Sequence, residues 1–176
     1  MSSSGDNEAL YAGLFQVLDG LWFVRLEKEF GFEKALQLDK EVWEIFARKE
    51  AQRLVKFLMD KGTITKSDGP VTILEKILPI SIFNKTLKFR IETNGKDELE
   101  FIVFECKTLA GMKKIGRPEQ QAHTVCFDMG FTYYNHFAKE IDPAFNVSCM
   151  FTPYKKLVDA PGNGLCGWRF KIGNKK

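Results

Sequence analysis

The first candidate for chemistry is the segment 39–57, DKEVWEIFARKEAQRLVKF, which places ionisable side chains on the apolar face of a predicted helix. Wound at about 100° per residue, it puts Asp39, Glu50 and Arg53 in one narrow band. The aromatic side chains in the same band are Trp43, Phe46 and Phe57. Burying charged groups is costly unless they pair or serve a pocket. We therefore expect either a structural ion network, with Glu50 and Arg53 paired at i,i+3 spacing, or the lining of a small-molecule pocket.

A further carboxylate, Asp19, stands among apolar residues in the segment 18–23, LDGLWF. An acid in such surroundings is either a paired structural carboxylate or a second pocket residue. Tryptophan also occurs in this segment, at Trp22, and again near the end of the chain at Trp168. An aromatic-lined pocket built from these tryptophans and Trp43 would suit an apolar or aromatic ligand.

The four cysteines, Cys106, Cys126, Cys149 and Cys166, each fall on an apolar face of a predicted element. They are far apart in the sequence and form no CxxC pair, so the spacing is a weak signal for zinc. Three interpretations stay open: small hydrophobic core residues, metal ligands, or a nucleophilic thiol. Only Cys126 has a neighbouring ligand type, because His123 lies three residues before it and could act as its base.

The spacing of apolar residues along the chain predicts the helices and strands that would position these residues. Helices are expected over 7–30, over 33–61 with a bend near 37–39, over 70–78 and from 118 to about 139. Strands are expected over 87–93, 99–106, 145–151 and 165–172, the first two joined as a hairpin through NGKDE. Both sides of 99–106 are apolar, which is typical of a central strand covered on both faces. We therefore predict one α+β domain over 1–176, with residues 1–6 as a loose tail. Its N-terminal helices pack on a small, mainly antiparallel sheet, with one further long helix between strands.

Composition excludes several classes of protein. The chain has 176 residues, 44% of them hydrophobic, and a net charge of +3 with scattered basic residues, so no nucleic-acid partner is expected. The start, MSSSGDNEAL, is polar and indicates no signal peptide. No uninterrupted apolar run reaches the ~18 residues of a membrane span. We expect a cytoplasmic protein with reduced thiols and no membrane partner. The apolar surplus in residues 10–26 fits a homodimer or a buried central helix.

Two blocks, residues 19–54 and 104–172, resemble the bacterial family named for L-2-amino-thiazoline-4-carboxylic acid hydrolase and its related uncharacterised cytosolic branch. The second block includes GRPE, VCFDMG and GLCGWRFKI. The matching positions are Asp19, Trp22, Phe23, Gly31, Asp39, Trp43, Glu50, Cys106, Cys126, Cys166 and Trp168. The resemblance implies hydrolytic opening of a thiazoline-type ring. A likeness in architecture to the 4-vinyl reductase type of small-molecule-binding domain implies instead a sensor or carrier.

Two functions follow as hypotheses. In the first, a hydrolase cleaves a cyclic C–N substrate, with Cys126 as nucleophile and His123 as base. Glu50 and Asp39 would act as acid and base, Arg53 would hold a substrate carboxylate, and Trp22, Trp43, Asp19 and Trp168 would line the substrate site. Alternatively, zinc or another transition metal held by Cys106, Cys126 and Cys166 would activate water. In the second, the same pocket binds a small molecule without catalysis.

Overall fold

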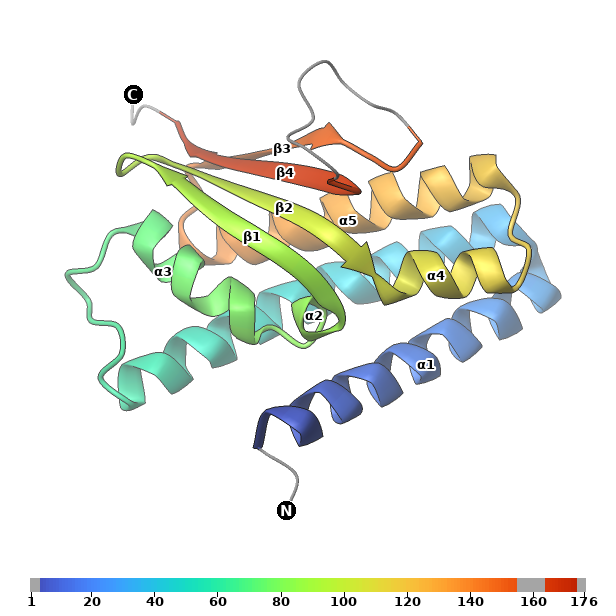
Figure 1. Ribbon diagram of the computed structural model, residues 1–176, viewed down its shortest axis with the longest axis horizontal. Coiled ribbons are helices and arrows are strands. Elements are labelled where there is room, and N and C mark those ends of the chain that lie inside the picture. Colours follow the sequence, from blue (N-terminus) through green and yellow to red (C-terminus); the bar gives the residue numbers. More distant parts are fainter. Residues whose placement is uncertain (1–3, 155–163, 174–176) are drawn as a thin grey trace.

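The chain folds into helices on one side of a four-stranded sheet, as a computed structural model shows for residues 4–154 and 164–173 (Figure 1). The helices are α1 (Ser4–Phe30), α2 (Phe32–Asp60), α3 (Pro70–Ile77), α4 (Lys107–Lys114) and α5 (Glu119–Ile141), and two short 3-10 turns, η1 (Leu78–Ile80) and η2 (Asn84–Thr86), follow α3. The strands are β1 (Leu87–Asn94), β2 (Glu98–Cys106), β3 (Phe145–Phe151) and β4 (Cys166–Ile172). The predicted α+β class is confirmed. The predicted tail is helical from Ser4 onward, and residues 1–3 lie outside the described residues.

The sheet has the strand order β1-β2-β4-β3, and every neighbouring pair is antiparallel. As predicted, β2 is a central strand, and its Phe101, Ile102 and Val103 are all buried. Phe101 lies opposite Ile91 of β1 and Trp168 of β4. Alternate residues of a strand point to opposite faces, so Phe101 and Val103 turn toward the same side. Both belong to the main hydrophobic core.

The helices form two layers beneath the sheet (Figure 1). The inner layer contains α2 and α5, which pack on each other, and the buried side of α2 carries small residues that include Ala47 and Ala51. Helix α1 packs on α2 and lies farther from the sheet. The helices meet the sheet in a ring cluster that contains Tyr134, whose ring centroid lies 5.3 Å from Trp168 and 5.5 Å from Phe101. This packing anchors α5 to the sheet.

Helices α1 and α2 are joined through the single residue Gly31, which has a φ of 82°. This left-handed conformation is easy for glycine and costly for other residues. The first helix ends at Phe30, the end expected from the sequence. The reversal brings α1 back along α2. The predicted bend near 37–39 is wrong, because α2 runs as one helix through these positions.

Much of the apolar surface of α1 is left uncovered. Along its outward side Leu14 is 56% exposed, Leu21 63% and Trp22 62%. The stretch Asn7–Phe30 is apolar on average and long enough to cross a membrane. Only 6% of its most apolar 18-residue segment is buried in the fold. The uninterrupted apolar runs on which the expectation of no membrane span rests are shorter than this stretch. Of the two interpretations of residues 10–26, a buried central helix is therefore wrong.

Candidate functional site

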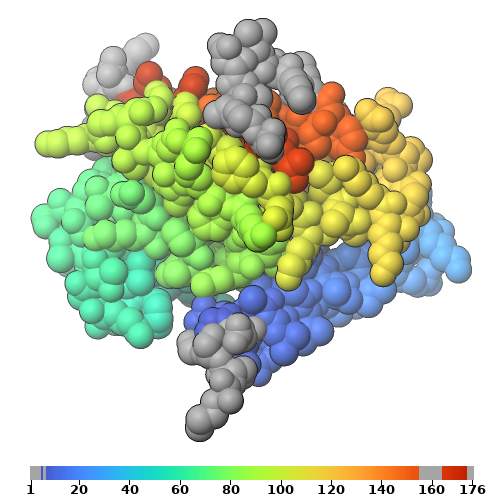
Figure 2. Space-filling view, in the orientation of Figure 1, coloured from blue at the N-terminus to red at the C-terminus, as the bar shows by residue number. Residues whose placement is uncertain are grey.

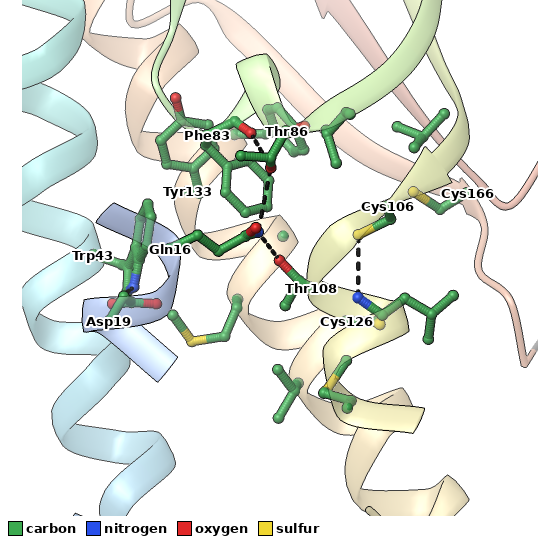
Figure 3. A pocket seen from close by; sticks show the side chains of 18 of the residues that line it. Gln16, Asp19, Trp43, Phe83, Thr86, Cys106, Thr108, Cys126, Tyr133 and Cys166 are labelled. Carbon is green, nitrogen blue, oxygen red and sulfur yellow. Dashed lines mark hydrogen bonds between the residues drawn. The ribbon is translucent and has the colours of Figure 1, made fainter. Parts of the chain in front are cut away.

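An apolar cavity of about 110 Å³ lies between α1, α5 and one end of the sheet (Figure 3). Its wall includes Ala12 of α1, Trp43 of α2, Val103 of β2, Met112 of α4 and Met129 of α5. The volume is smaller than the roughly 150 Å³ of an engineered cavity that takes up benzene. A ligand of this cavity must therefore be narrow, or α1 must shift to admit it.

One end of the cavity is marked by two carboxylates on facing helices. Asp19 of α1 accepts a hydrogen bond of 3.1 Å from the indole N–H of Trp43, and Asp39 of α2 lines the same end. Burial raises the pKa of Asp19 to about 6, against the effect of the indole bond. Burial, together with repulsion by Asp19, raises the pKa of Asp39 to about 7. This pair therefore exchanges protons near neutral pH, which is unusual for aspartate.

The opposite end carries three thiols, those of Cys106, Cys126 and Cys166 (Figure 3). Cys106 ends β2 and caps α4, because its sulfur accepts a hydrogen bond of 3.4 Å from the backbone N–H of Leu109. Burial raises the pKa of all three thiols, that of Cys126 to about 12. They are therefore neutral thiols at pH 7, and a neutral thiol is a poor nucleophile.

A polar bridge crosses the cavity between these two ends. The side-chain amide of Gln16 in α1 donates to the hydroxyl of Thr86 at 3.2 Å and also to the hydroxyl of Thr108 in α4. These two hydrogen bonds tie α1 to both η2 and α4 (Figure 3). Sequence reasoning missed Gln16, because a single glutamine in an apolar helix is not distinguishable from a solvent-facing one. Its only signal is its place among apolar neighbours.

Glu50, a predicted catalytic acid, lies outside the cavity wall and holds the chain after α3. Its two carboxylate oxygens accept hydrogen bonds from the backbone N–H of Ile82 at 2.6 Å and from the hydroxyl of Tyr133 at 2.7 Å. The pKa of Glu50 is raised by burial, and these two bonds counteract that rise. The predicted pair with Arg53 is not formed. Glu50 therefore supports the wall from behind, since Tyr133 and Ile82 both line the cavity.

Three other predicted site residues also lie apart from the cavity. Arg53 and Trp22 are exposed, so neither lines the apolar space. His123 is not part of the wall either, and its ring packs between Phe127 and Tyr154, with centroids 6.4 Å and 6.0 Å away. The described residues contain no hydrogen bond from His123 to a cysteine. By contrast, Trp168 is buried and lines the cavity.

The thiols that meet at the cavity were also predicted as metal ligands. Among residues 4–154 and 164–173 there is no group of three or more His, Cys, Asp or Glu side chains arranged to hold a metal ion. The thiols of Cys106, Cys126 and Cys166 influence one another electrostatically, yet each sits in an apolar wall. Zinc or another transition metal therefore stays a sequence prediction.

Comparison with solved structures finds the same fold in a trafficking protein particle complex subunit 3 from Naegleria fowleri, solved covalently bound to palmitic acid. The two chains share 15% sequence identity, align over 96% of each and superpose with a TM-score of 0.52. At this identity the likeness shows the fold alone. No curated protein sequence matches the chain. The profile of a family of unknown function (DUF6125) matches residues 10–172, which is nearly the whole chain, and so the protein belongs to that family.

Proposed function

We propose that this protein is a non-catalytic carrier or sensor that binds a narrow, mainly apolar molecule in the cavity between α1, α5 and the sheet. The observation that carries the proposal is the chemistry of the wall, which is apolar apart from a few groups such as Gln16 and the two aspartates. Binding sites for small molecules combine such walls with a few placed polar groups. The thiols at one end are held neutral by burial, which suits contact with hydrocarbon.

The shared fold gives independent support. The Naegleria fowleri protein, which has this fold, is described as covalently bound to palmitic acid, and this supports an alkyl chain as the ligand here. The cavity here is smaller than such a chain requires. Since α1 forms one wall and packs mainly on α2, a small outward movement of α1 would lengthen the space without disturbing the sheet.

A second candidate is the hydrolase, and a specific observation favours it. General acid–base catalysis works best with groups whose pKa lies near the working pH, and Asp19 and Asp39 have such values. The two carboxylates would then replace Cys126 and His123 as the reacting groups. A thiazoline ring would have to reach them through the apolar space.

Binding is tested by calorimetry of the full chain with straight-chain alcohols of four to sixteen carbons, which carry no charge. We expect binding that strengthens with chain length up to a limit set by the cavity. The variants Ala12→Leu and Cys126→Leu fill the cavity from two different helices and should weaken binding at least tenfold. Ala9→Leu, on the same helix as Ala12 but outside the wall, is the matched control.

Circular dichroism of each variant shows whether it is folded before its binding is judged. Unchanged affinity in both cavity-filling variants would overturn the proposed site. Turnover of a thiazoline substrate that is lost in Asp39→Asn and kept in Cys126→Ala, which removes the thiol without filling the cavity, would instead favour the hydrolase carried by the carboxylates.

A further inference from the structure

A second hollow adjoins the thiol end of the cavity, and its lining is basic. This open groove has a volume of about 490 Å³ and lies between η2, the start of β1, the end of β2 and α4. Its charged lining residues are four lysines and one glutamate: Lys85, Lys88, Lys107, Lys113 and Glu105. Four lysines around one open groove produce a positive local potential that attracts anions.

Two of these lysines are already neutralised and two are not. Lys85 pairs with Glu8 at 2.7 Å, and Lys88 pairs with Glu105 at 2.6 Å. Lys107 and Lys113, in the first and last turns of α4, have no ion pair within the described residues. Both are exposed. The groove therefore offers two ammonium groups to an incoming anion.

The groove and the cavity share part of their walls. Five residues border both spaces: Thr86, Leu87, Cys106, Leu109 and Leu165. Only side chains therefore separate the basic groove from the apolar interior, and three of the five are leucines, whose side chains can change rotamer. A molecule with a charged head in the groove would have its chain directed toward the cavity.

We propose, on the basis of the binding function above, that the groove is the head-group site for an anionic amphiphile with a carboxylate or phosphate head. The alkyl chain passes the shared wall into the cavity, and Lys107 and Lys113 hold the head. Burial of the alkyl chain supplies most of the binding free energy. Exposed charge pairs contribute little free energy and are screened by salt, so the lysines mainly supply selectivity for an anionic head. The ligand class is thereby narrowed from apolar molecules in general to singly or doubly charged alkyl anions.

The test compares heads at constant chain length. Dodecanoate, dodecyl phosphate and dodecanol are titrated into the full chain by calorimetry, below their micelle concentrations, together with inorganic phosphate alone. We expect both anions to bind about tenfold more tightly than dodecanol, and high salt to remove that preference. In Lys107→Gln/Lys113→Gln the preference should disappear while dodecanol affinity stays unchanged. Lys49→Gln/Lys66→Gln removes two exposed lysines from elsewhere and should change nothing.

Each alternative outcome has a distinct meaning. Failure of all chain-bearing ligands to bind overturns the proposed function itself. Equal binding of dodecanol and the anions, or a preference that survives in Lys107→Gln/Lys113→Gln, overturns the head-group site and leaves the cavity proposal standing. Tight binding of inorganic phosphate alone would identify a free-anion site and overturn the amphiphile.

An independent observation concerns the uncovered side of α1. Leu10, Leu14, Val17, Leu21 and Val24 follow one another at alternating intervals of four and three, and all are between 44% and 63% exposed. This is the spacing of a heptad seam, which packs against another helix. Figure 2 shows α1 (blue) along the lower edge of the molecule. Tyr11, Leu18 and Trp22 widen the seam and are also exposed.

The area of this surface is that of an interface. With on the order of 100 Å² exposed per side chain, the eight residues present about 800 Å², the amount that each partner buries in a standard stable interface. The largest apolar patch on an ordinary monomer is about 300–600 Å². The uncovered side of α1 therefore exceeds what a monomer usually exposes.

The inner side of α1 argues against insertion of this helix across a membrane. Arg117, whose side chain is only 5% exposed, holds Glu27 of α1 through two bonds of 2.9 Å and 2.6 Å. Asp19 is tied to Trp43 at 3.1 Å. A spanning helix would have to break these bonds and carry its acids into lipid, which is costly. A second copy of the chain covers the seam from outside and leaves these inner-side bonds intact.

We infer that two copies of the chain pair through α1 in an antiparallel, two-fold arrangement centred near Val17. Such an interface is self-complementary, because it sets Leu10 of one copy beside Val24 of the other. Analytical ultracentrifugation of the wild type, whose monomer mass is 20.2 kDa, should show a dimer without detergent. Leu14→Lys/Leu21→Lys should weaken dimerisation more than 100-fold with unchanged circular dichroism, whereas Ile115→Lys, at another exposed apolar position, should not.

A wild type that stays monomeric at 100 µM, or a double lysine variant that stays dimeric, contradicts this pairing. A wild type that is soluble only with detergent or lipid vesicles would indicate a membrane partner and would also overturn it.

Discussion

Replacing Asp39 by asparagine should stabilise the protein at neutral and alkaline pH. Asp39 has an ordinary pKa of 3.8, which burial and the charge of Asp19 raise to about 7 in the folded chain. The rise is about three pH units, and at about 1.4 kcal/mol per unit the ionised group costs the fold on the order of 4 kcal/mol above pH 8. Asparagine keeps the shape and removes the charge. Allowing for relaxation, we expect a gain of about 2–4 kcal/mol.

The sign of the pH dependence follows from the direction of this pKa. Between about pH 4 and pH 7 the folded state retains a proton on Asp39 that the unfolded state has lost, so wild-type stability falls as pH rises through that window. The asparagine side chain cannot titrate, so the variant lacks this component. The advantage of Asp39→Asn should thus be near zero at pH 4 and complete by about pH 8.

The assay is urea denaturation followed by far-ultraviolet circular dichroism at several pH values from 4 to 8.5. Subtracting the two free energies of unfolding at each pH leaves the contribution of Asp39 together with its repulsion of Asp19, because more distant titrating groups such as His136 are common to both proteins. Asp60→Asn is the control, since Asp60 is an exposed partner of Lys56 on the same helix. Free energies for wild type and Asp39→Asn that run parallel across the whole range would refute the reasoning.

Three further predictions concern the wall. Glu50→Leu leaves the N–H of Ile82 and the hydroxyl of Tyr133 without their acceptor, and should lower the free energy of unfolding by about 1–3 kcal/mol; a loss below ~0.5 kcal/mol in urea denaturation would contradict that role. Gly130→Ala places a Cβ 2.5 Å from the Trp168 ring and should destabilise by about 1–3 kcal/mol, whereas an added Cβ at the helical Gly13 meets nothing within 4 Å, so Gly13→Ala should be neutral or stabilising by up to about 1 kcal/mol. Timed alkylation of the native protein at pH 8, read by mass spectrometry, should modify Cys126 at least 100-fold more slowly than free cysteine, because its pKa is raised to about 12; a rate above that of free cysteine would restore it as a nucleophile.

The order and approximate limits of the four strands and of helices α1, α2, α3 and α5 were predictable from the sequence, because they depend on local patterns. Apolar residues on both sides of 99–106 identified it as a central strand, and the structure has β2 at Glu98–Cys106 between β1 and β4. The first helix was expected to end at residue 30, directly before Gly31. In the structure Gly31 has a φ of 82°, which glycine adopts at low cost. Both signals require only neighbouring residues.

The contents of the site depend on contacts between distant residues, which local patterns do not specify. Glu50 and Asp39 share one helical band, yet Glu50 pairs with Ile82, 32 positions away, while Asp39 lines the cavity opposite Asp19. Likewise Cys106 and Cys166 face the same cavity only because β2 and β4 are neighbours in the sheet.

Helix α1 illustrates the same division. Its sequence is apolar on several sides, so periodicity predicted a helix and left open which side is buried. Packing on α2 decided this: Asp19 and Gln16 turn inward to Trp43, Thr86 and Thr108, and the leucine seam remains outside. The period of a helix is encoded along the chain, whereas the neighbour that each face meets is chosen by the free energy of the whole assembled fold.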